Sequence, residues 1–280
     1  MYLVIQGADI ETGDLKTLAK LSGATAIDRL TDGAFRLNNA QPADGIAALC
    51  ADAKLDFGFV PEGRRLSDFR LLVMDMDSTL ITMETIDELA DMVNLKAGVA
   101  AITARAMRGE IDYDESLRER LALLRGLDES ALQRVYDERL KFSPGAERML
   151  EKVRAAGIKT LLVSGVFTWI TDRLKPRVRL DYTHSNQLEI VNGKLTGAVT
   201  GGIVNADAKR AMLLKVAAEL GASRAQIAGV GDGANDLKFL AECGVSFAYR
   251  AKPVVREQTT YAINHAGLDA MLCLLSAEQA

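Results

Sequence analysis

The fold of this chain is decided by the stretch Leu71-Leu72-Val73-Met74-Asp75-Met76-Asp77-Ser78-Thr79-Leu80. Its first four residues form a short continuous apolar run, which is typical of a strand buried on both faces of a parallel sheet. Similar runs recur at 158–163, 225–230 and 245–248, with helical patterns between them. Strands that alternate with helices predict an α/β fold with a doubly wound parallel sheet. Because ligands bind beyond the carboxyl ends of such strands, the residues that follow each run are the first candidates for a site.

Two carboxylates follow the first run directly. Asp75 and Asp77 are two positions apart, and side chains at i and i+2 of an extended chain point to the same side. We therefore expect both to lie in one pocket, where they would repel each other unless a cation or a proton separates their roles. A lone aspartate at a strand end is usually only a cap for the next turn. The pair within Asp-Met-Asp-Ser-Thr-Leu is far more specific for a catalytic site.

Two more strand ends carry groups that suit phosphate and a cation. Ser164-Gly165 ends the second run and precedes a helical pattern at 166–174. A hydroxyl and free N–H groups at a helix N-terminus bind phosphate oxygens, although a plain turn explains the dipeptide equally well. The run at 225–230 leads into Gly231-Asp232-Gly233-Ala234-Asn235-Asp236. The carboxylates of Asp232 and Asp236 are ligands that Mg2+ prefers in proteins.

A long helical insertion separates the first strand from the second. The pattern at about 83–142 is almost entirely helical, with a predicted capping box at Thr85-x-x-Glu88 and candidate caps at Asp112 and Asp114. An insertion at this place is expected to form a cap over the site. A second insertion, at 187–199, predicts a hairpin around Asn192-Gly193.

Two cations stand out from their surroundings. Arg120 shares one helical face with the leucines at positions i−3, i+1 and i+4. An arginine on an apolar face needs an anionic partner or must reach water, and the sequence leaves open whether that partner is a substrate carboxylate or an internal Asp or Glu. Lys209 lies early in a helix that begins near 205–207, where most lysines are solvated. Only the other motifs make Lys209 a candidate counter-ion for phosphate.

The N-terminal part of the chain has a different pattern. Residues 1–65 show strands and helices in the order β-α-β-β-α-β, which predicts a small α+β domain. The polar stretch 61–68 is predicted to be a linker to the second unit, 66–280.

Composition excludes several classes of protein. A net charge of −4 among 280 residues offers no electrostatic reason to bind nucleic acid or an anionic membrane. No apolar run approaches the roughly 18 residues of a membrane span, and the first residues do not resemble a signal peptide. Three widely spaced cysteines form no disulfide pattern, so we expect a reducing compartment and a cytoplasmic protein.

The strand-end motifs together resemble those of the haloacid dehalogenase (HAD) superfamily of phosphatases. In chain order these motifs are 75–80, Ser164-Gly165, Lys209 and 231–236. More narrowly, the segments 84–88, 116–120 and 193–197 are similar to the phosphoserine phosphatase family. The resemblance extends from about residue 69 to the C-terminus and implies a HAD-like core. The first 60 residues resemble the small ACT-like domain of some bacterial members.

The resemblance implies Mg2+-dependent hydrolysis of O-phospho-L-serine to L-serine and phosphate, the last step of serine biosynthesis. Asp75 would be the nucleophile that forms an aspartyl-phosphate, and Asp77 the general acid and base. Mg2+ would be held by the carboxylates of Asp75 and Asp232 and the main-chain carbonyl of Asp77, with Asp236 in support.

The same resemblance implies roles around the substrate. Ser164, the Gly165 N–H and Lys209 would offset phosphoryl charge, with Asn235 on the phosphate side. From the cap, Glu84 would take the substrate ammonium and Arg120 its carboxylate. Two further cap residues, Met107 and Tyr113, match positions that line the family's substrate pocket.

Two other functions remain open. A phosphatase or phosphotransferase for another small phosphomonoester would share the three aspartates, and only Glu84 and Arg120 speak against it. A phospho-acceptor signalling module would have no use for Asp77 as an acid or for a helical cap. The N-terminal domain is expected either to sense an amino acid or to mediate a homodimer.

Overall fold

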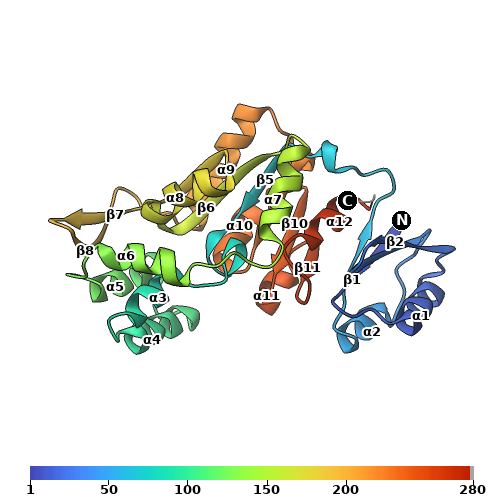
Figure 1. Ribbon diagram of the computed structural model, residues 1–280, viewed down its shortest axis with the longest axis horizontal. Coiled ribbons are helices and arrows are strands. Elements are labelled where there is room, and N and C mark those ends of the chain that lie inside the picture. The colour runs from blue at the N-terminus through green and yellow to red at the C-terminus, as the bar shows by residue number, and fades with distance from the viewer. Residues whose placement is uncertain (278–280) are drawn as a thin grey trace.

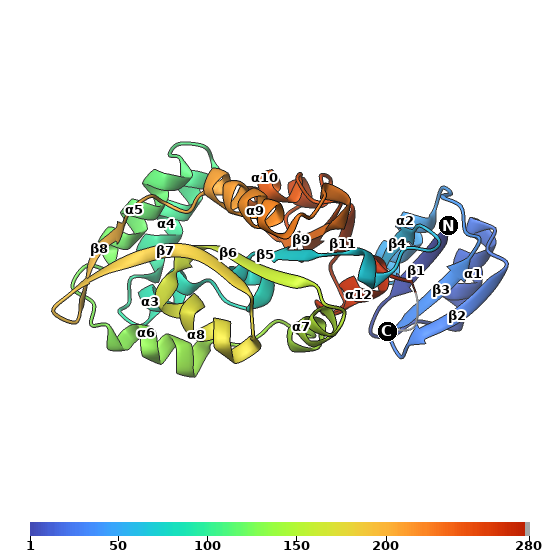
Figure 2. The same cartoon turned by 90° about the horizontal axis from the view of Figure 1, so that it is seen from above.

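The computed structural model describes residues 1–277, in which two sheets and their helices lie along one long axis (Figures 1 and 2). The predicted α/β fold, with its parallel sheet, helical cap and small N-terminal α+β part, is confirmed. The last three residues of the predicted second unit, 278–280, lie outside the described residues.

The larger sheet has seven strands, and the strand that directly precedes Asp75 lies at its centre. Neighbouring strands are parallel except for the last, which pairs antiparallel with its neighbour. In spatial order the strands are β11 (Tyr261–Ile263), β10 (Val245–Tyr249), β9 (Ile227–Gly231), β5 (Leu71–Met74), β6 (Lys159–Phe167), β7 (Tyr182–Val191) and β8 (Lys194–Thr200).

Helices cover both faces of this sheet because successive side chains of its central strand point to opposite faces. Leu71 and Val73 belong to the core cluster of one face, and Leu72 and Met74 to that of the other. Figure 2 shows the resulting layers on either side of the sheet. The first face packs against α9 (Ala206–Leu220), α10 (Leu237–Leu240) and α11 (Pro253–Arg256), and the second against α7 (Ala146–Ala155), α8 (Thr168–Val178) and α12 (Ala270–Leu275).

The helical cap is inserted between β5 and α7. The segments that enter and leave the cap lie side by side, since the Thr82 N–H donates to the Lys141 carbonyl at 2.9 Å. Asp112 caps its helix as predicted, accepting the Glu115 N–H at 2.8 Å. The cap contains α3 (Thr85–Asp91), α4 (Lys96–Met107), α5 (Tyr113–Leu123), α6 (Ser130–Arg134) and one further turn, Val135–Arg139.

The predicted hairpin is confirmed and holds the cap from one side. Positive φ angles at Asn192 (52°) and Gly193 (72°) form the tight turn between β7 and β8. The Leu195 carbonyl accepts the Gly126 N–H at 2.7 Å, and the Leu195 N–H donates to Leu127 at 2.9 Å. Strand β8 is therefore hydrogen-bonded to the loop between α5 and α6, at the far end of the molecule in Figure 1.

The smaller, antiparallel sheet lies at the opposite end of the molecule. One of its faces is covered by its own two helices, and the other packs on the larger domain, where Gly58 comes so close that an added Cβ would meet Tyr261 at 2.6 Å. The buried Asp56 carboxylate accepts the N–H groups of residues 264–266 at 2.8–3.0 Å, which joins the two parts. The sheet contains β2 (Ala26–Thr31), β3 (Ala34–Asn38), β1 (Tyr2–Gln6) and β4 (Asp56–Val60), and its helices are α1 (Thr12–Ser22) and α2 (Ile46–Asp52).

Within residues 1–277, the longest apolar helical segments fall short of what is needed to cross a membrane. The three cysteines are buried and unpaired.

Candidate active site

A cavity of about 1050 Å³ lies between the cap and the carboxyl ends of β5, β6 and β9. Nine of the ten residues that the sequence singled out for catalysis, substrate binding or metal binding line this cavity, and the tenth, Asp236, is fully buried next to it. Tyr113 and Met107 from the cap line it too, with Met107 at the rim and 65% exposed.

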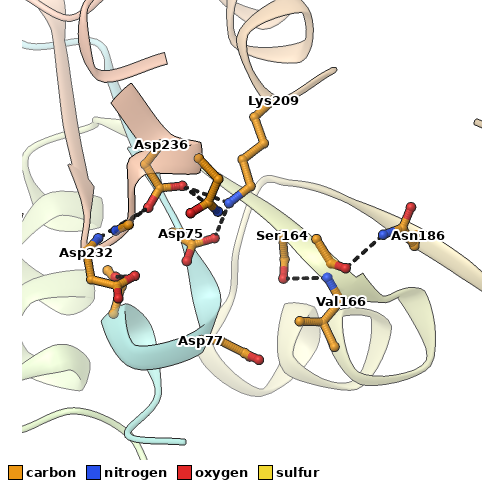
Figure 3. A network of polar contacts seen from close by, with 12 residues as sticks. Asp75, Asp77, Ser164, Val166, Asn186, Lys209, Asp232 and Asp236 are labelled. Carbon is orange, nitrogen blue, oxygen red and sulfur yellow. Dashed lines mark hydrogen bonds and ion pairs between the residues drawn. The ribbon is translucent and has the colours of Figure 1, made fainter. Parts of the chain in front are cut away.

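A buried lysine links two of the strand ends. The Lys209 ammonium lies 2.5 Å from Oδ1 of Asp75 and 2.8 Å from Oδ1 of Asp236, as Figure 3 shows. Burial alone lowers the pKa of Lys209, but the charges of Asp236 and Asp75 outweigh it and raise the pKa. The sequence position of Lys209 favours a solvated side chain, but the structure shows a buried one. Lys209 is 1% exposed and carries its charge into the site.

Three carboxylates gather around this lysine. Oxygens of Asp75, Asp232 and Asp236 all lie within 4.8 Å of one another. Burial and the neighbouring Asp236 raise the pKa of Asp75 well above its ordinary value and that of Asp232 to about 7. One ammonium leaves this cluster with excess negative charge, and carboxylate oxygens are the donors that suit a hard cation. The donor set therefore fits Mg2+.

Asp236 holds the loop that carries Asp232. Its second oxygen, Oδ2, accepts the backbone N–H groups of Asp232 and Gly233, both at 3.2 Å. A Cβ at Gly231 would lie 2.5 Å from the same oxygen, so this turn needs a glycine for close approach.

Asp77 is held by a residue that the sequence assigned to another task. Its two oxygens accept the Thr85 N–H at 2.7 Å and the Thr85 hydroxyl at 2.9 Å. The predicted capping box is thus wrong, because Glu84 occupies the N-cap position of α3 and Thr85 turns toward Asp77. Burial and the charge of Glu84 raise the pKa of Asp77 well above its ordinary value, which favours a protonated carboxyl group.

Glu84 and Arg120 bring opposite charges to the same cavity. Ser78, at a strained positive φ of 55°, donates its hydroxyl to Glu84 at 2.6 Å. Arg120 donates Nε to the Ser116 carbonyl at 3.3 Å, and no carboxylate within residues 1–277 forms an ion pair with it. Of the internal carboxylates that the sequence left open as partners, Glu84 interacts with Arg120 at longer range, since the charge of Arg120 lowers its pKa, but the two form no ion pair.

The segment around Ser164-Gly165 differs from its prediction. Strand β6 continues to Phe167 because its pairing with β7 shifts register after Ser164, so α8 begins two residues later than expected. Ser164 Oγ accepts the Val166 N–H at 3.1 Å. A Cβ at Gly165 would lie 1.9 Å from the Tyr113 hydroxyl, so only a glycine lets the cap approach this closely.

Sequence reasoning missed two buried or half-buried asparagines beside this segment. Asn186 donates to the Gly165 carbonyl and accepts the Val204 N–H, both at 2.8 Å. Asn205 caps α9, accepting N–H groups at 3.1 and 3.2 Å. Asn186 lies within a strand, where an amide gives no local signal, whereas Asn205 could have been found as a preferred helix cap.

Comparison with known proteins agrees with this geometry. Residues 72–241 match the family described as haloacid dehalogenase-like hydrolase, and residues 3–46 match a domain of unknown function. A phosphoserine phosphatase from Polaromonas is 51% identical over 75% of this chain and 92% of its own length.

Solved structures of phosphoserine phosphatases are also similar to this chain. A probable phosphoserine phosphatase from Vibrio cholerae is 34% identical, with a TM-score of 0.86 over 99% of this chain and 86% of the other. A phospho-aspartyl intermediate analogue of phosphoserine phosphatase is 34% identical, with a TM-score of 0.69 over 73% of this chain and 97% of the other. The first match includes the N-terminal sheet.

Proposed function

Because this chain belongs to the haloacid dehalogenase-like hydrolases, and within them to the phosphoserine phosphatase family, we propose that it hydrolyses O-phospho-L-serine to L-serine and phosphate. The observation that carries the proposal is the pair Glu84 and Arg120, which bring a negative and a positive charge to the cavity that holds Asp75. A free amino acid presents the complementary ammonium and carboxylate.

Asp75 is the proposed nucleophile. A carboxylate oxygen forms a bond to phosphorus, the bond from phosphorus to the serine oxygen breaks, and an aspartyl-phosphate results. Lys209, 2.5 Å from Asp75, lowers the pKa of that carboxylate against the effect of burial and offsets the charge of the phosphoryl oxygens. The known phospho-aspartyl analogue of a family member supports this step.

Asp77 is the proposed general acid and base. Its raised pKa suits a carboxyl group that gives a proton to the departing serine oxygen. The resulting carboxylate then takes a proton from the water that attacks phosphorus of the aspartyl-phosphate, which frees phosphate and restores Asp75. The two bonds from Thr85 hold this carboxyl group in one orientation.

The remaining groups bind the phosphoryl end. When bound, Mg2+ would be held by the carboxylates of Asp75 and Asp232 and by the main-chain carbonyl of Asp77, and would supply positive charge to the phosphoryl oxygens. Ser164, the Gly165 N–H and Asn235 line the same end of the cavity and are proposed to donate hydrogen bonds there.

Recognition of serine is assigned to the cap. Arg120 has no internal ion pair in the described chain and can form a planar, two-bond contact with the substrate carboxylate. Glu84 is proposed to accept the substrate ammonium in its ionised form. Burial raises the pKa of Glu84, and the Ser78 hydroxyl and the charge of Arg120 act against that rise.

The wider setting is proposed on the same basis. The reaction would be the last step of serine biosynthesis, and the three unpaired cysteines support a cytoplasmic location. Residues 1–65 are proposed as a separate ACT-like domain that binds an amino acid or mediates a homodimer, with the cap at about 83–142 as part of the unit 66–280.

Phosphate release from a panel of monoesters tests the function. With Mg2+, we expect the highest kcat/KM for phosphoserine, lower values for phosphoethanolamine and an aryl phosphate, and none with a chelator. Equal values for phosphoserine and phosphoethanolamine would favour a phosphatase or phosphotransferase for other small monoesters. A phosphoenzyme that persists without turnover would instead indicate a phospho-acceptor module.

A further inference from the structure

One asparagine makes contacts with both the core and the cap. Asn205 Oδ1 accepts the N–H groups of Asp207 and Ala208 at the start of α9. Its Nδ2 donates to the carboxylate of Asp114 in the first turn of α5, at 3.1 Å to Oδ1 and 3.4 Å to Oδ2. The oxygen of this amide therefore accepts hydrogen bonds from the core helix α9, and its nitrogen donates hydrogen bonds to the cap helix α5.

The core side of this contact is rigid. The residue before Asn205 is Val204, whose N–H is bonded to Asn186, and Asn186 also holds the Gly165 carbonyl. The Asn205 carbonyl accepts the Lys209 N–H at 2.9 Å, so Lys209 lies one turn further along the same helix. Asn205 is thus fixed relative to the phosphate end of the cavity.

On the cap side, Asp114 is connected through helix α5 to Arg120, which lies at the end of the cavity proposed to bind the serine part of the substrate. Asp114 follows Tyr113, whose hydroxyl lies against Gly165, and precedes Arg120 by less than two turns of α5. A helix moves as a unit over this length, so a shift at Asp114 also moves the Arg120 guanidinium. Both Asp114 and Asn205 line the cavity.

Electrostatics favour this arrangement. The N-terminus of α9, a helix of 15 residues, carries partial positive charge, and the Asp114 carboxylate lies next to its N-cap. The contact is a hydrogen bond to a charged acceptor, which is stronger than one between neutral groups.

We propose that Asp114 and Asn205 form a positioning pair that sets the spacing between Lys209 at the phosphate end and Arg120 at the carboxylate end. The pair therefore helps to determine which substrates fit. This inference rests on the proposed function, because it assumes that Arg120 binds the substrate carboxylate. An aryl phosphate without a carboxylate needs only the phosphate end, so its hydrolysis does not depend on the spacing.

The test exchanges the two side chains. Asn205→Asp keeps an oxygen that caps α9, since Asp and Asn are about equal as N-caps, but places two carboxylates face to face. We expect kcat/KM for phosphoserine to fall about 10-fold, mainly through KM, and that for an aryl phosphate to change less than about 2-fold. Asp114→Asn keeps a neutral hydrogen bond and is expected to cost about 2- to 3-fold.

The double variant Asn205→Asp/Asp114→Asn restores one amide and one carboxylate in reversed order. We expect its kcat/KM for phosphoserine to return to within about 3-fold of the original, whereas independent effects would multiply to about 20- to 30-fold. If the double variant is no better than Asn205→Asp, the pair is not a positioning device. If Asp114→Asn alone raises kcat/KM, charge rather than contact is responsible, which also overturns the proposal. Arg118→Ala, on the exposed side of α5, is the matched control.

Failure of the positioning pair can be distinguished from failure of the proposed function. If the unmodified protein hydrolyses an aryl phosphate but not phosphoserine, the proposed function fails. The contact between Asp114 and Asn205 is then tested by the unfolding midpoints of the unmodified protein, the two single variants and the double variant. Recovery in the double variant of the stability lost in Asn205→Asp supports the contact, and no recovery refutes it.

Discussion

Lys209 donates its ammonium to Asp75 across 2.5 Å, and both side chains are buried. The two residues are 134 positions apart and meet only because β5 and the start of α9 lie at the same edge of the larger sheet. Burial and the charge of Asp236 raise the pKa of this carboxylate well above its ordinary value, whereas the charge of Lys209 lowers it. Lys209 acts against that rise in pKa, and its hydrogen bond goes to Oδ1, not to the second oxygen of the proposed nucleophile.

Replacing the nucleophile is expected to stop turnover. Asp75→Asn removes the charged oxygen that bonds to phosphorus, and loss of a covalent nucleophile commonly lowers kcat by several powers of ten. The measurements are phosphate release and trapping of a phosphoenzyme. Asp75→Ala serves as a second variant because it cannot revert by deamidation. More than a few per cent of the original turnover in either protein would contradict the assignment.

The Asp77→Asn variant is expected to depend on the leaving group. An amide cannot protonate the serine oxygen, but a phenol leaves readily without help. Because general acid catalysis contributes roughly 10²- to 10⁴-fold, phosphoserine hydrolysis is expected to fall by that range and aryl phosphate hydrolysis by much less. Mg2+ affinity stays largely intact, since the main-chain carbonyl is unchanged. Equal losses on both substrates would argue for a structural role.

Arg120→Ala separates serine recognition from general phosphatase activity. Removing one partner of a desolvated charge pair costs about 2–5 kcal/mol, or roughly 30- to 5000-fold in kcat/KM. We expect this loss for phosphoserine and almost none for phosphoethanolamine, which has no carboxylate. Lysine at this position cannot reproduce the planar contact, so Arg120→Lys is expected to recover little. A uniform loss on all substrates would mean that Arg120 only supports the cap.

Stability without metal is expected to depend on pH in a specific direction. The pKa of Asp232 is raised from 3.8 to about 7, so the folded protein binds a proton that the unfolded chain has already released. The free energy of unfolding of the metal-free protein therefore falls as pH rises from about 4 to about 7. Mg2+ is expected to raise the unfolding midpoint more at about pH 8 than at about pH 5, because protons compete with the cation.

Asp232→Asn is the control for that experiment. It removes one titrating carboxylate, so both the pH dependence and the stabilisation by Mg2+ are expected to shrink. A Mg2+ effect that is unchanged in this variant would show that the cation binds elsewhere.

The contact between the two sheets offers a test of the N-terminal part. Asp56→Ala leaves three backbone N–H groups of residues 264–266 without their acceptor, and a buried unsatisfied polar group costs about 1–3 kcal/mol. We expect a lower unfolding midpoint with kcat preserved. Deleting residues 1–65 is expected to leave an active phosphatase, since every proposed catalytic residue comes later in the chain. Loss of catalysis in a folded truncated protein would show that the N-terminal part completes the site.

Local pattern was enough to predict the strand-end carboxylates. Four apolar residues before Asp75 indicate a strand buried on both faces, and such strands end where ligands bind. The face of α5 was also predictable, since Leu117 and Leu121 are buried and Arg118 is exposed. These features depend on periodicity within a few residues.

Features that depend on distant contacts could not be predicted in this way. Lys209 is buried because Asp75 and Asp236 surround it, and its own helix gives no sign of them. Thr85 fits a capping pattern at its helix start, but the Asp77 carboxylate binds both its donors. The delayed start of α8 follows from a register shift against the neighbouring strand β7, which the sequence of β6 alone does not contain.

The close approach of Tyr113 to Gly165 limits how this enzyme can be redesigned. A Cβ at position 165 would lie 1.9 Å from the tyrosine hydroxyl, so a library that diversifies this position alone is expected to contain almost no working members. Gly165→Ala becomes acceptable only together with a shorter side chain at position 113, such as Tyr113→Phe or smaller. The two positions, one in the cap and one in the core, therefore have to be mutated jointly, and in natural relatives they are expected to covary.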